Sequence, residues 1–319
     1  MSNQTQLISV VIPLFNKEQY TRRALQSVLA QTFQRFEVIV VDDGSTDRGV
    51  DSVTEINDPR ISVIRQKNAG VSAARNRGVE EAKGELVAFL DADDEWTPDH
   101  LHTITRMRTE FPDAGLYACA YCTYLAGGKI VDHRGGVVRP GSEEKMLHNY
   151  FRSANSGEAA LHISAVAVTK GIFTEVGGFL VGEKLGEDLE FICKVSITYP
   201  VAYSDRIGVT YYRDVEDSAV SSNIMVTQLP FVKTARHYLD KGSVDKSMVN
   251  DLLDFIAEHQ LWLIRRDILA GHSAAARSML ADCHTSRYRM RKMWWSFWSV
   301  LPRRVTRTVF NLKEYIKQR

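Results

Sequence analysis

The sequence predicts an α/β protein with a mostly parallel central sheet, followed by a helical C-terminal region. Short apolar runs without a polar break, such as Leu-Val-Ala-Phe-Leu at 86–90, are typical of strands buried on both faces. Between these runs, apolar residues recur at the spacing of one helix face. Beyond Asn223 only the helical spacing remains.

Length and composition place the chain among soluble globular proteins. Its 319 residues suffice for one large or two ordinary domains, with 44% hydrophobic and 25% charged residues. Four cysteines are too few for a disulfide scaffold. The polar first residues lack a signal-peptide core, and no apolar run reaches the roughly 18 residues needed to span a bilayer. We therefore expect a cytoplasmic protein.

The elements up to residue 97 alternate between strands and helices. Strands are expected at 8–15, 36–41, 61–64 and 86–90, and helices at 18–31, 48–56 and 71–82. This order favours a parallel sheet. Farther along, we expect a helix at 98–110, strands at 115–125 and 161–168, and a turn at 126–129. We also expect a basic loop at 131–141 that lies on the surface or forms part of the rim of a substrate site.

Acidic residues gather where one buried strand ends. Asp91, Asp93 and Asp94 directly follow the run at 86–90. Ligands of open α/β sheets bind outside the carboxyl ends of the strands, and hard divalent cations prefer carboxylate oxygens. The pattern therefore indicates a Mg²⁺ or Mn²⁺ site that holds a diphosphate. The alternative is that Asp91 only ends the strand, while Asp94 or Thr97 caps the next helix.

A second acidic pair, Asp42 and Asp43, follows the strand at 36–41. Asp-Gly and Ser-Thr-Asp at 43–47 also suit a turn and a helix cap, which explains the turn but not two adjacent acids. The chain has neither G-x-G-x-x-G after its first strand nor G-x-x-x-x-G-K-[S/T], so Rossmann and P-loop mechanisms are disfavoured.

Four motifs in this order, at 11–16, 41–47, 68–76 and 90–94, resemble those of family 2 glycosyltransferases, which have the GT-A fold. The resemblance implies a nucleotide-sugar donor, which we expect to be UDP-linked, and a Mn²⁺ or Mg²⁺ ion held by Asp93. The residues it implies for nucleotide-sugar binding are Pro13, Phe15, Asn16, Asp42, Asp43, Gly70, Arg75, Asp91 and Ala92.

The resemblance continues with a Gly-Gly-Phe turn at 177–179 and the acidic pair Glu187-Asp188 at the start of a helix. It implies that Asp188 is the catalytic base and that Glu187 orients the acceptor. A carboxylate can take the proton of an acceptor hydroxyl as the new glycosidic bond forms, and one base opposite the leaving group implies inversion. The alternative is that the helix dipole simply favours acids at a helix N-terminus.

A third segment resembles the family's Tyr-Arg-x-His sequence only in part. Tyr212 and Arg213 match, but Val215 stands where the family has His. Arg213 is expected to pair with the diphosphate or to be solvated on the surface. Since the resemblance covers roughly residues 8–220, we expect a catalytic domain at 1–220, with a nucleotide-sugar-binding half at 1–97 and an acceptor half at 98–220, followed by a helical region at 221–319.

The C-terminal tail is basic and aromatic. Residues 284–319 contain ten lysines and arginines and one acid, so this tail carries +9 while the rest of the chain carries −8. Arginines flank Met290, Met293, Trp294 and Phe297, which recur at helical spacing. We expect 285–319 either to bind the anionic inner face of the cell membrane or to pack on the catalytic domain. Nucleic acid is not expected, because no nucleic-acid-binding fold surrounds the cluster.

These observations predict an inverting, metal-dependent glycosyltransferase. It would move a sugar from a nucleotide donor to a hydroxyl of a saccharide or lipid-linked acceptor in cell-surface polysaccharide synthesis. The chain lacks Gln-x-x-Arg-Trp, so single additions are favoured over processive synthesis. The rival predictions are a nucleotidyltransferase, which would release pyrophosphate, and a catalytically inactive interaction protein of the same fold.

Overall fold

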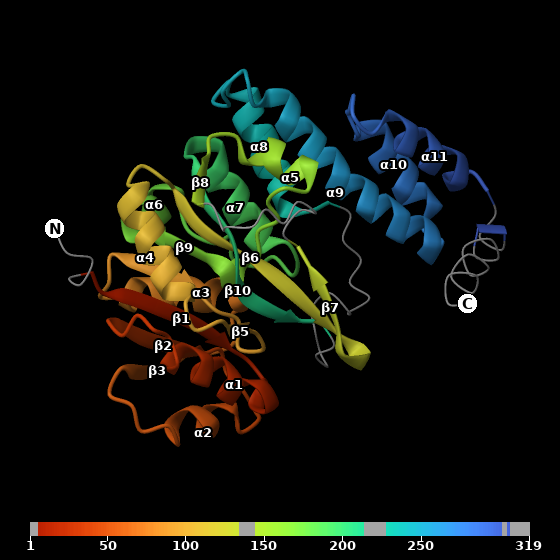
Figure 1. Cartoon of the computed structure of the whole chain (residues 1–319). Coiled ribbons are helices and arrows are strands. Elements are labelled where there is room, and N and C mark those ends of the chain that lie inside the picture. Colours follow the sequence, from red (N-terminus) through yellow and green to blue (C-terminus); the bar gives the residue numbers. More distant parts are fainter. Residues whose placement is uncertain (1–5, 134–143, 214–227, 302–304, 307–319) are drawn as a thin grey trace. The chain divides into compact units, whose positions relative to one another are not determined.

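The computed structural model of the chain describes residues 6–133, 144–213, 228–301, 305 and 306 (Figure 1). The chain divides into two compact units, residues 1–223 and 224–319. No helix in the described part of the chain is both long and apolar enough to cross a membrane.

The first unit begins with the expected alternation of strands and helices. Its elements up to residue 89 are β1 (Ile8–Leu14), α1 (Glu18–Leu29), β2 (Phe36–Asp42), α2 (Gly49–Thr54), β3 (Ile61–Arg65), α3 (Val71–Glu81) and β4 (Leu86–Phe89). The later elements are β5 (Glu95–Trp96), α4 (His100–Glu110), β6 (Leu116–Leu125), η1 (Ala126–Gly128), β7 (Lys129–Asp132), β8 (Glu144–Leu147), α5 (Tyr150–Ser156), η2 (Ile163–Ala165), β9 (Val166–Thr169), α6 (Lys170–Glu175), α7 (Glu187–Thr198) and β10 (Val201–Tyr212).

One sheet joins these strands in the order β3-β2-β1-β4-β9-β6-β10-β5. The strands from β3 to β4 are parallel, β9 is antiparallel to both of its neighbours, and β6 and β10 are again parallel. Consequently β1, β2, β4, β6 and β10 all end at the same edge of the sheet, and β9 begins there. This edge is where ligands of open α/β sheets bind.

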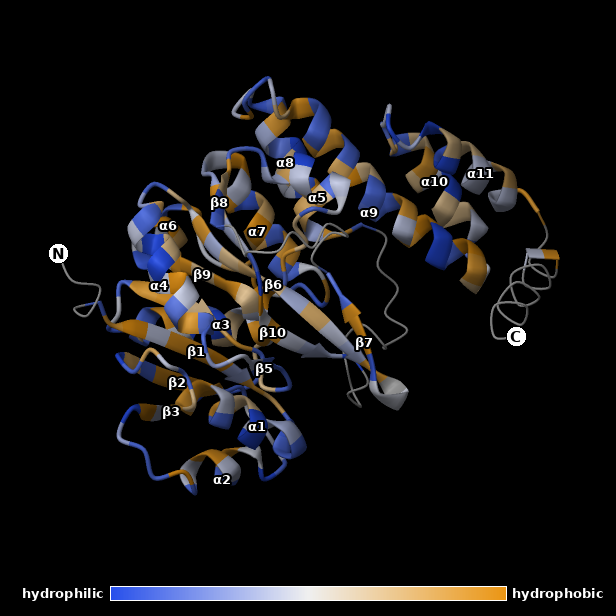
Figure 2. Ribbon diagram, viewed as in Figure 1, coloured by the Kyte–Doolittle hydropathy of each residue, from blue (hydrophilic) through white to orange (hydrophobic). Residues whose placement is uncertain are grey.

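Helices cover both faces of the sheet, as the unbroken apolar strands predicted. Alternate residues of β1, such as Val10 and Ile12, join a buried core with α1 and α4 (Figure 2). Val11 points to the other face, where α3 packs. A Cβ at Gly78 of α3 would lie 2.3 Å from Val11 Cγ1, so only glycine permits this close approach.

Two predicted segments differ from the structure. The strand expected at 161–168 starts only at Val166, because His162 Nδ1 accepts a hydrogen bond from Ser164 N (3.3 Å) and starts the 3-10 turn η2. The loop expected at 131–141 begins as strand β7, which pairs with β6. Its His133 stacks on Tyr121, with 4.5 Å between ring centroids. Residues 134–141 lie outside the described residues.

Asn76 of α3 holds the Gly-Gly-Phe turn against the sheet. Its Nδ2 donates to Phe179 O and its Oδ1 accepts from Phe179 N, both at 2.9 Å. From the other side, Lys194 Nζ on α7 donates to Gly178 O (2.7 Å). The turn therefore joins α3, which follows the first half of the motifs, to α7, which carries Glu187.

Replacing Gly178 with alanine should cost more stability than replacing Gly177. Both glycines have positive φ, 61° and 82° respectively, so each alanine should lose about 1 kcal/mol to backbone strain. A Cβ at Gly178 would also lie 2.9 Å from Asn76 Oδ1, whereas one at Gly177 meets nothing within 4 Å. We expect Gly178→Ala to lower the free energy of unfolding by a further 1–3 kcal/mol or so. Equal losses in urea titrations would contradict this account of the turn.

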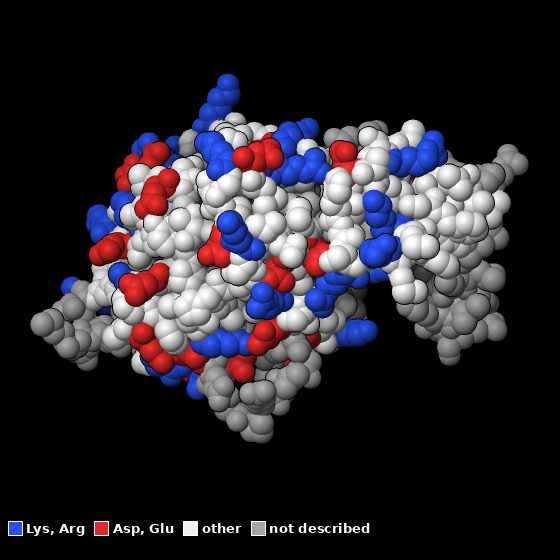
Figure 3. All heavy atoms as spheres, turned by 90° about the horizontal axis from the view of Figure 1, so that it is seen from above, with Lys and Arg blue, Asp and Glu red and all other residues white. Residues whose placement is uncertain are grey.

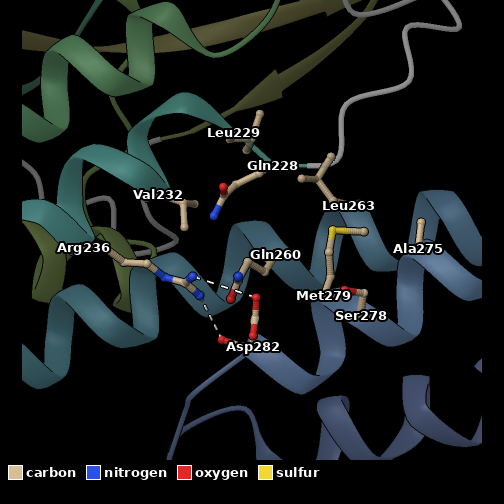
Figure 4. A pocket seen from close by; sticks show the side chains of 10 residues that line it. All are labelled: Gln228, Leu229, Val232, Arg236, Gln260, Leu263, Ala275, Ser278, Met279 and Asp282. Atoms are coloured by element: carbon tan, nitrogen blue, oxygen red, sulfur yellow. Dashed lines mark hydrogen bonds and ion pairs between the residues drawn. The ribbon is translucent and has the colours of Figure 1, made fainter.

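The described part of the second unit contains four helices: α8 (Pro230–Asp240), α9 (Val249–Ala270), α10 (Ser273–Asp282) and α11 (Arg289–Ser299). Residues of α9, α10 and α11 share an apolar core. A pocket of about 300 Å³ lies among α8, α9 and α10 (Figure 4). Its two charged residues, Arg236 and Asp282, lie 4.0 Å apart and form an ion pair.

Candidate active site

The exits of β1 and β2 are tied together by side chains from the first two motifs. Asn16 adopts a positive φ of 50°, and its Oδ1 accepts from Thr46 N (2.8 Å). Asp42 is buried, and its Oδ1 accepts from Ser45 N (2.9 Å). Pro13 is buried within β1, while the next aromatic residue, Phe15, is 45% exposed. The ring of Phe15 is therefore open to a flat ligand at this edge.

Asp43 organises the loop that leads into α3. Its Oδ1 accepts from Gln66 Nε2 (2.7 Å) and Ala69 N (2.9 Å), and its Oδ2 accepts from Gly70 N (2.8 Å). A carboxylate has about four acceptor positions, so roughly one remains for a base or ribose. Gly70 has a φ of 91° and is exposed. Asp43 thus has a structural role that the motif alone did not reveal.

Arg75 joins the two halves of the motif set. This arginine of α3 is 2% exposed, and its Nη2 donates to Asp91 Oδ1 (2.7 Å) while its Nη1 donates to Glu187 Oε1 (3.0 Å). Burial disfavours the charge on Asp91, but Arg75, His162 and Lys17 together outweigh burial and hold the pKa of Asp91 below its usual value. Burial and the neighbouring Asp188 raise the pKa of Glu187. One guanidinium therefore brings the end of β4 to the start of α7.

Glu187 and Asp188 open α7, as predicted. Gly186, with a φ of 82°, turns the chain into the helix. Asp188 Oδ1 accepts from Leu189 N (2.7 Å), and among the described residues Asp188 Oδ2 accepts no hydrogen bond. Asp188 acts electrostatically on both Arg75 and His162, so it lies with the residues of the β4 end. Its second oxygen is free to meet a substrate.

Asp93 and Ala92 take different positions in the motif that follows β4. Asp93 Oδ2 pairs with Lys17 Nζ at 2.9 Å, and its side chain is 20% exposed. Ala92 is buried in the core below. A cation at Asp93 would have to share this carboxylate with Lys17.

Asp94 does not cap a helix, contrary to the alternative considered from the sequence. The cap position of α4 is Asp99, and Asp94 is buried with its Oδ2 accepting from Ser164 Oγ (2.6 Å) and its Oδ1 accepting from Tyr212 N (3.3 Å). Burial, followed by repulsion from Asp91 and Asp93, raises its pKa well above the usual value.

His162 is a site residue that sequence reasoning missed. Its Nδ1 lies 3.6 Å from Asp94 Oδ2, and its ring packs on Tyr211 with 4.6 Å between centroids. Burial lowers the pKa of His162, although Asp91 opposes this shift. No local pattern marks His162 as a site residue: the sequence predicted only a strand at 161–168, and in the structure His162 precedes η2 and that strand.

The donor atoms at this edge fit a divalent cation. One ligand atom each from Asp91, Asp94 and His162 lies within 4.8 Å of the others, and carboxylate and imidazole are ligands of Mn²⁺. Asp93, the predicted ligand, lies outside this set but is more exposed than Asp94. Both oxygens of Asp94 already accept hydrogen bonds, so Asp91 and Asp93 are the more accessible carboxylates.

Arg213 lies at the end of β10. Its backbone N donates to Tyr124 O (3.1 Å), and its side chain is exposed. The structure shows no ion pair of this side chain within the described residues, so its expected pairing with diphosphate stays a prediction. Val215, the position that departs from the family pattern, lies outside the described residues.

A family model described as "Glycosyl transferase family 2" matches residues 9–156, from β1 through α5. Over these residues, a little under half of the chain, the sequence is that of a family 2 glycosyltransferase. The solved structure of TarS residues 1–349 from S. aureus, in complex with UDP-GlcNAc, superposes with a TM-score of 0.68 at 19% identity, covering 96% of this chain and 92% of TarS 1–349. This likeness shows that the chain has a GT-A fold followed by C-terminal helices.

Curated relatives match shorter stretches. The uncharacterized glycosyltransferase YibD of Escherichia coli K12 is 43% identical over 112 residues, covering 34% of this chain and 33% of YibD. The succinoglycan biosynthesis protein ExoW of Rhizobium meliloti is 33% identical over 211 residues, covering 58% of this chain and 62% of ExoW. The chain therefore spans less than two-thirds of either relative.

Proposed function

We propose that this chain is an inverting, metal-dependent glycosyltransferase of family 2 that uses a UDP-sugar. It would act on a hydroxyl of a saccharide or lipid-linked acceptor in cell-surface polysaccharide synthesis. The complex of TarS with UDP-GlcNAc supports the donor class. The names of ExoW and of the putative colanic acid biosynthesis glycosyl transferase WcaA of E. coli support the pathway class. The observation that most directly supports this proposal is that Arg75 pairs with both Asp91 and Glu187 at the carboxyl edge of the sheet.

The two sides of Arg75 suit different substrates. Phe15, Asp43 and Asp91 lie at the strand ends where nucleotides bind in such sheets. Asp188 has an oxygen that is not engaged among the described residues, so it can accept the proton of the acceptor hydroxyl. Glu187 forms an ion pair with Arg75, so we assign it a role in holding the site in position rather than in taking the proton.

A divalent cation would stabilise the negative charge that develops on the departing nucleoside diphosphate. We propose Asp93 as its principal ligand, with Asp91 beside it. Lys17, at 2.9 Å from Asp93, supplies a further positive charge for the diphosphate oxygens. The fold holds Asp91, Asp93 and Lys17 in position before the substrate binds. These charged groups therefore need not be rearranged during the reaction, which is the advantage of a preorganised site.

Asp93→Asn should remove the metal-dependent part of nucleotide binding. In thermal-shift measurements we expect UDP with Mn²⁺ to raise the melting temperature of the unaltered chain more than UDP alone, because a ligand of the native state stabilises it. In Asp93→Asn the Mn²⁺ increment should disappear. Asp113→Asn, at an exposed position away from the site, is the matched control and should keep the increment. An increment of unchanged size in Asp93→Asn would exclude Asp93 as the ligand.

The reaction class is tested by its product. Incubation with a panel of UDP-sugars and oligosaccharide or polyprenyl-linked acceptors should release UDP, measured by a coupled assay. Release of pyrophosphate from a nucleoside triphosphate and a sugar phosphate would instead identify a nucleotidyltransferase and overturn the proposal.

A further inference from the structure

Helix α11 is apolar on two opposite sides. Trp295 and Trp298 are each 7% exposed and belong to the core of the second unit, together with Leu261 and Ile264 of α9. The sequence offered packing and membrane binding as alternatives for the whole aromatic stretch. In the structure only part of this stretch, which includes Trp295 and Trp298, packs in the core of the second unit.

The opposite side of α11 exposes large apolar side chains to solvent. At 100° per residue they fall within one sector of the helix. Their exposed fractions are Met290 84%, Met293 70%, Trp294 46%, Phe297 56% and Val300 66%. A contiguous exposed patch of this kind is unusual on a soluble monomer and indicates an interaction surface. Figure 3, which shows one face of the chain, has an area of mostly uncharged residues on its right, where α10 and α11 stand in Figure 1, with Lys and Arg beside it.

The charge around this patch favours one occupant. Helix α11 contains Arg289, Arg291 and Lys292 and no acidic residue. Arg289 is exposed and lies one turn from Met293, at the border of the apolar sector. Arg291 pairs with Glu258, so it is partly neutralised, but the tail from 284 onward has a net formal charge of +9. An apolar helix face with basic neighbours matches the interface of an anionic membrane.

We propose that α11 docks the chain on an anionic lipid surface, with Met290, Met293, Trp294 and Phe297 inserted at the headgroup boundary and Arg289 near the lipid phosphates. The docking deepens the proposed function, since a lipid-linked acceptor lies in the same surface. It is nevertheless measured without donor or acceptor, so failure of lipid binding and failure of sugar transfer are distinguishable.

The experiment is flotation of the full chain with vesicles. Vesicles containing about one-third phosphatidylglycerol should carry the protein upward, and vesicles of phosphatidylcholine alone should carry much less. Added salt should reduce the anionic component. A full chain that stays in the soluble fraction with anionic vesicles at low salt overturns the proposal.

The double variant Met293→Gln, Phe297→Gln should weaken binding at least about tenfold, because it removes two apolar side chains from the inserted face. Both side chains are exposed, so its melting temperature should match that of the unaltered chain. The matched control is Ile130→Gln, Val181→Gln, which alters two exposed apolar residues of the first unit, 62% and 55% exposed, and should leave binding within about twofold. Equal binding by the two double variants, or a mass change in light scattering without vesicle binding, would show that another surface or a second copy is involved.

Discussion

Asp188→Asn is expected to abolish sugar transfer while leaving nucleotide binding nearly intact. A general base typically contributes about 10²–10⁴-fold, and an amide cannot accept the hydroxyl proton. Asp188 makes its hydrogen bond through Oδ1 to Leu189 N, which the amide oxygen of asparagine can also accept. We therefore expect kcat to fall by about three orders of magnitude with an unchanged melting temperature.

Two measurements make this prediction specific. The Kd for UDP with Mn²⁺ should stay within about twofold, because the substituted group acts on the acceptor rather than on the nucleotide. The second measurement is the activity of Glu187→Gln. This variant keeps the proposed base, Asp188, but weakens the contact between residue 187 and Arg75, so it should retain part of the activity. Turnover at the unaltered rate in Asp188→Asn would remove Asp188 from the mechanism.

Arg75→Met is expected to destabilise the first unit strongly. The substitution leaves the carboxylates of Asp91 and Glu187, whose side chains are 24% and 13% exposed, without their shared cation. Removing one partner of a buried ion pair costs about 3–5 kcal/mol, so the melting temperature should fall by several degrees or more. Arg77→Met on the same helix is the control. Its side chain is 48% exposed and its pairs are with Glu80 and Glu81, so the loss should be below about 1 kcal/mol.

The same variant should have a characteristic pH dependence. Because Arg75 holds the pKa of Asp91 below its unfolded value, the stability it provides through Asp91 is present above that unfolded value and is lost as pH falls through the folded one. The difference in melting temperature between the unaltered chain and Arg75→Met should therefore shrink in acid. A difference that stays constant from neutral pH to about pH 3 would show that lost packing, not charge, explains the effect.

The first half of the fold could be predicted because its determinants are local. Strands β1, β2 and β4 are parallel and covered on both faces, so each appears in the sequence as an unbroken apolar run, and the acids that end β2 and β4 mark the edge they share. Asp43 and Asp91 were proposed because they stand at such boundaries, whereas the Glu187-Asp188 pair was proposed from the family resemblance; the roles of all four stay predictions.

The inner part of the site could not be predicted, because distant contacts create it. Asp94 has the same local features as a capping residue, and only the packing of Ser164 and Tyr212 around it makes it a buried acid. His162 falls in a segment predicted only as a strand, and strands β5 and β8 are too short to show a period. The link from Asn76 to Phe179 likewise joins a helix to a turn, and neither local sequence suggests the other as its partner.

The two ion pairs of Arg75, with Asp91 and Glu187, also constrain which substitutions this chain can accept during evolution. A substitution at Asp91 alters the environment of Glu187 through their common counterion, so the effects of the two acids should not add. Natural variants that exchange one of these acids are expected to carry a compensating change at the other or at the arginine. A single arginine thus makes the effect of a substitution at Asp91 depend on the residue at position 187.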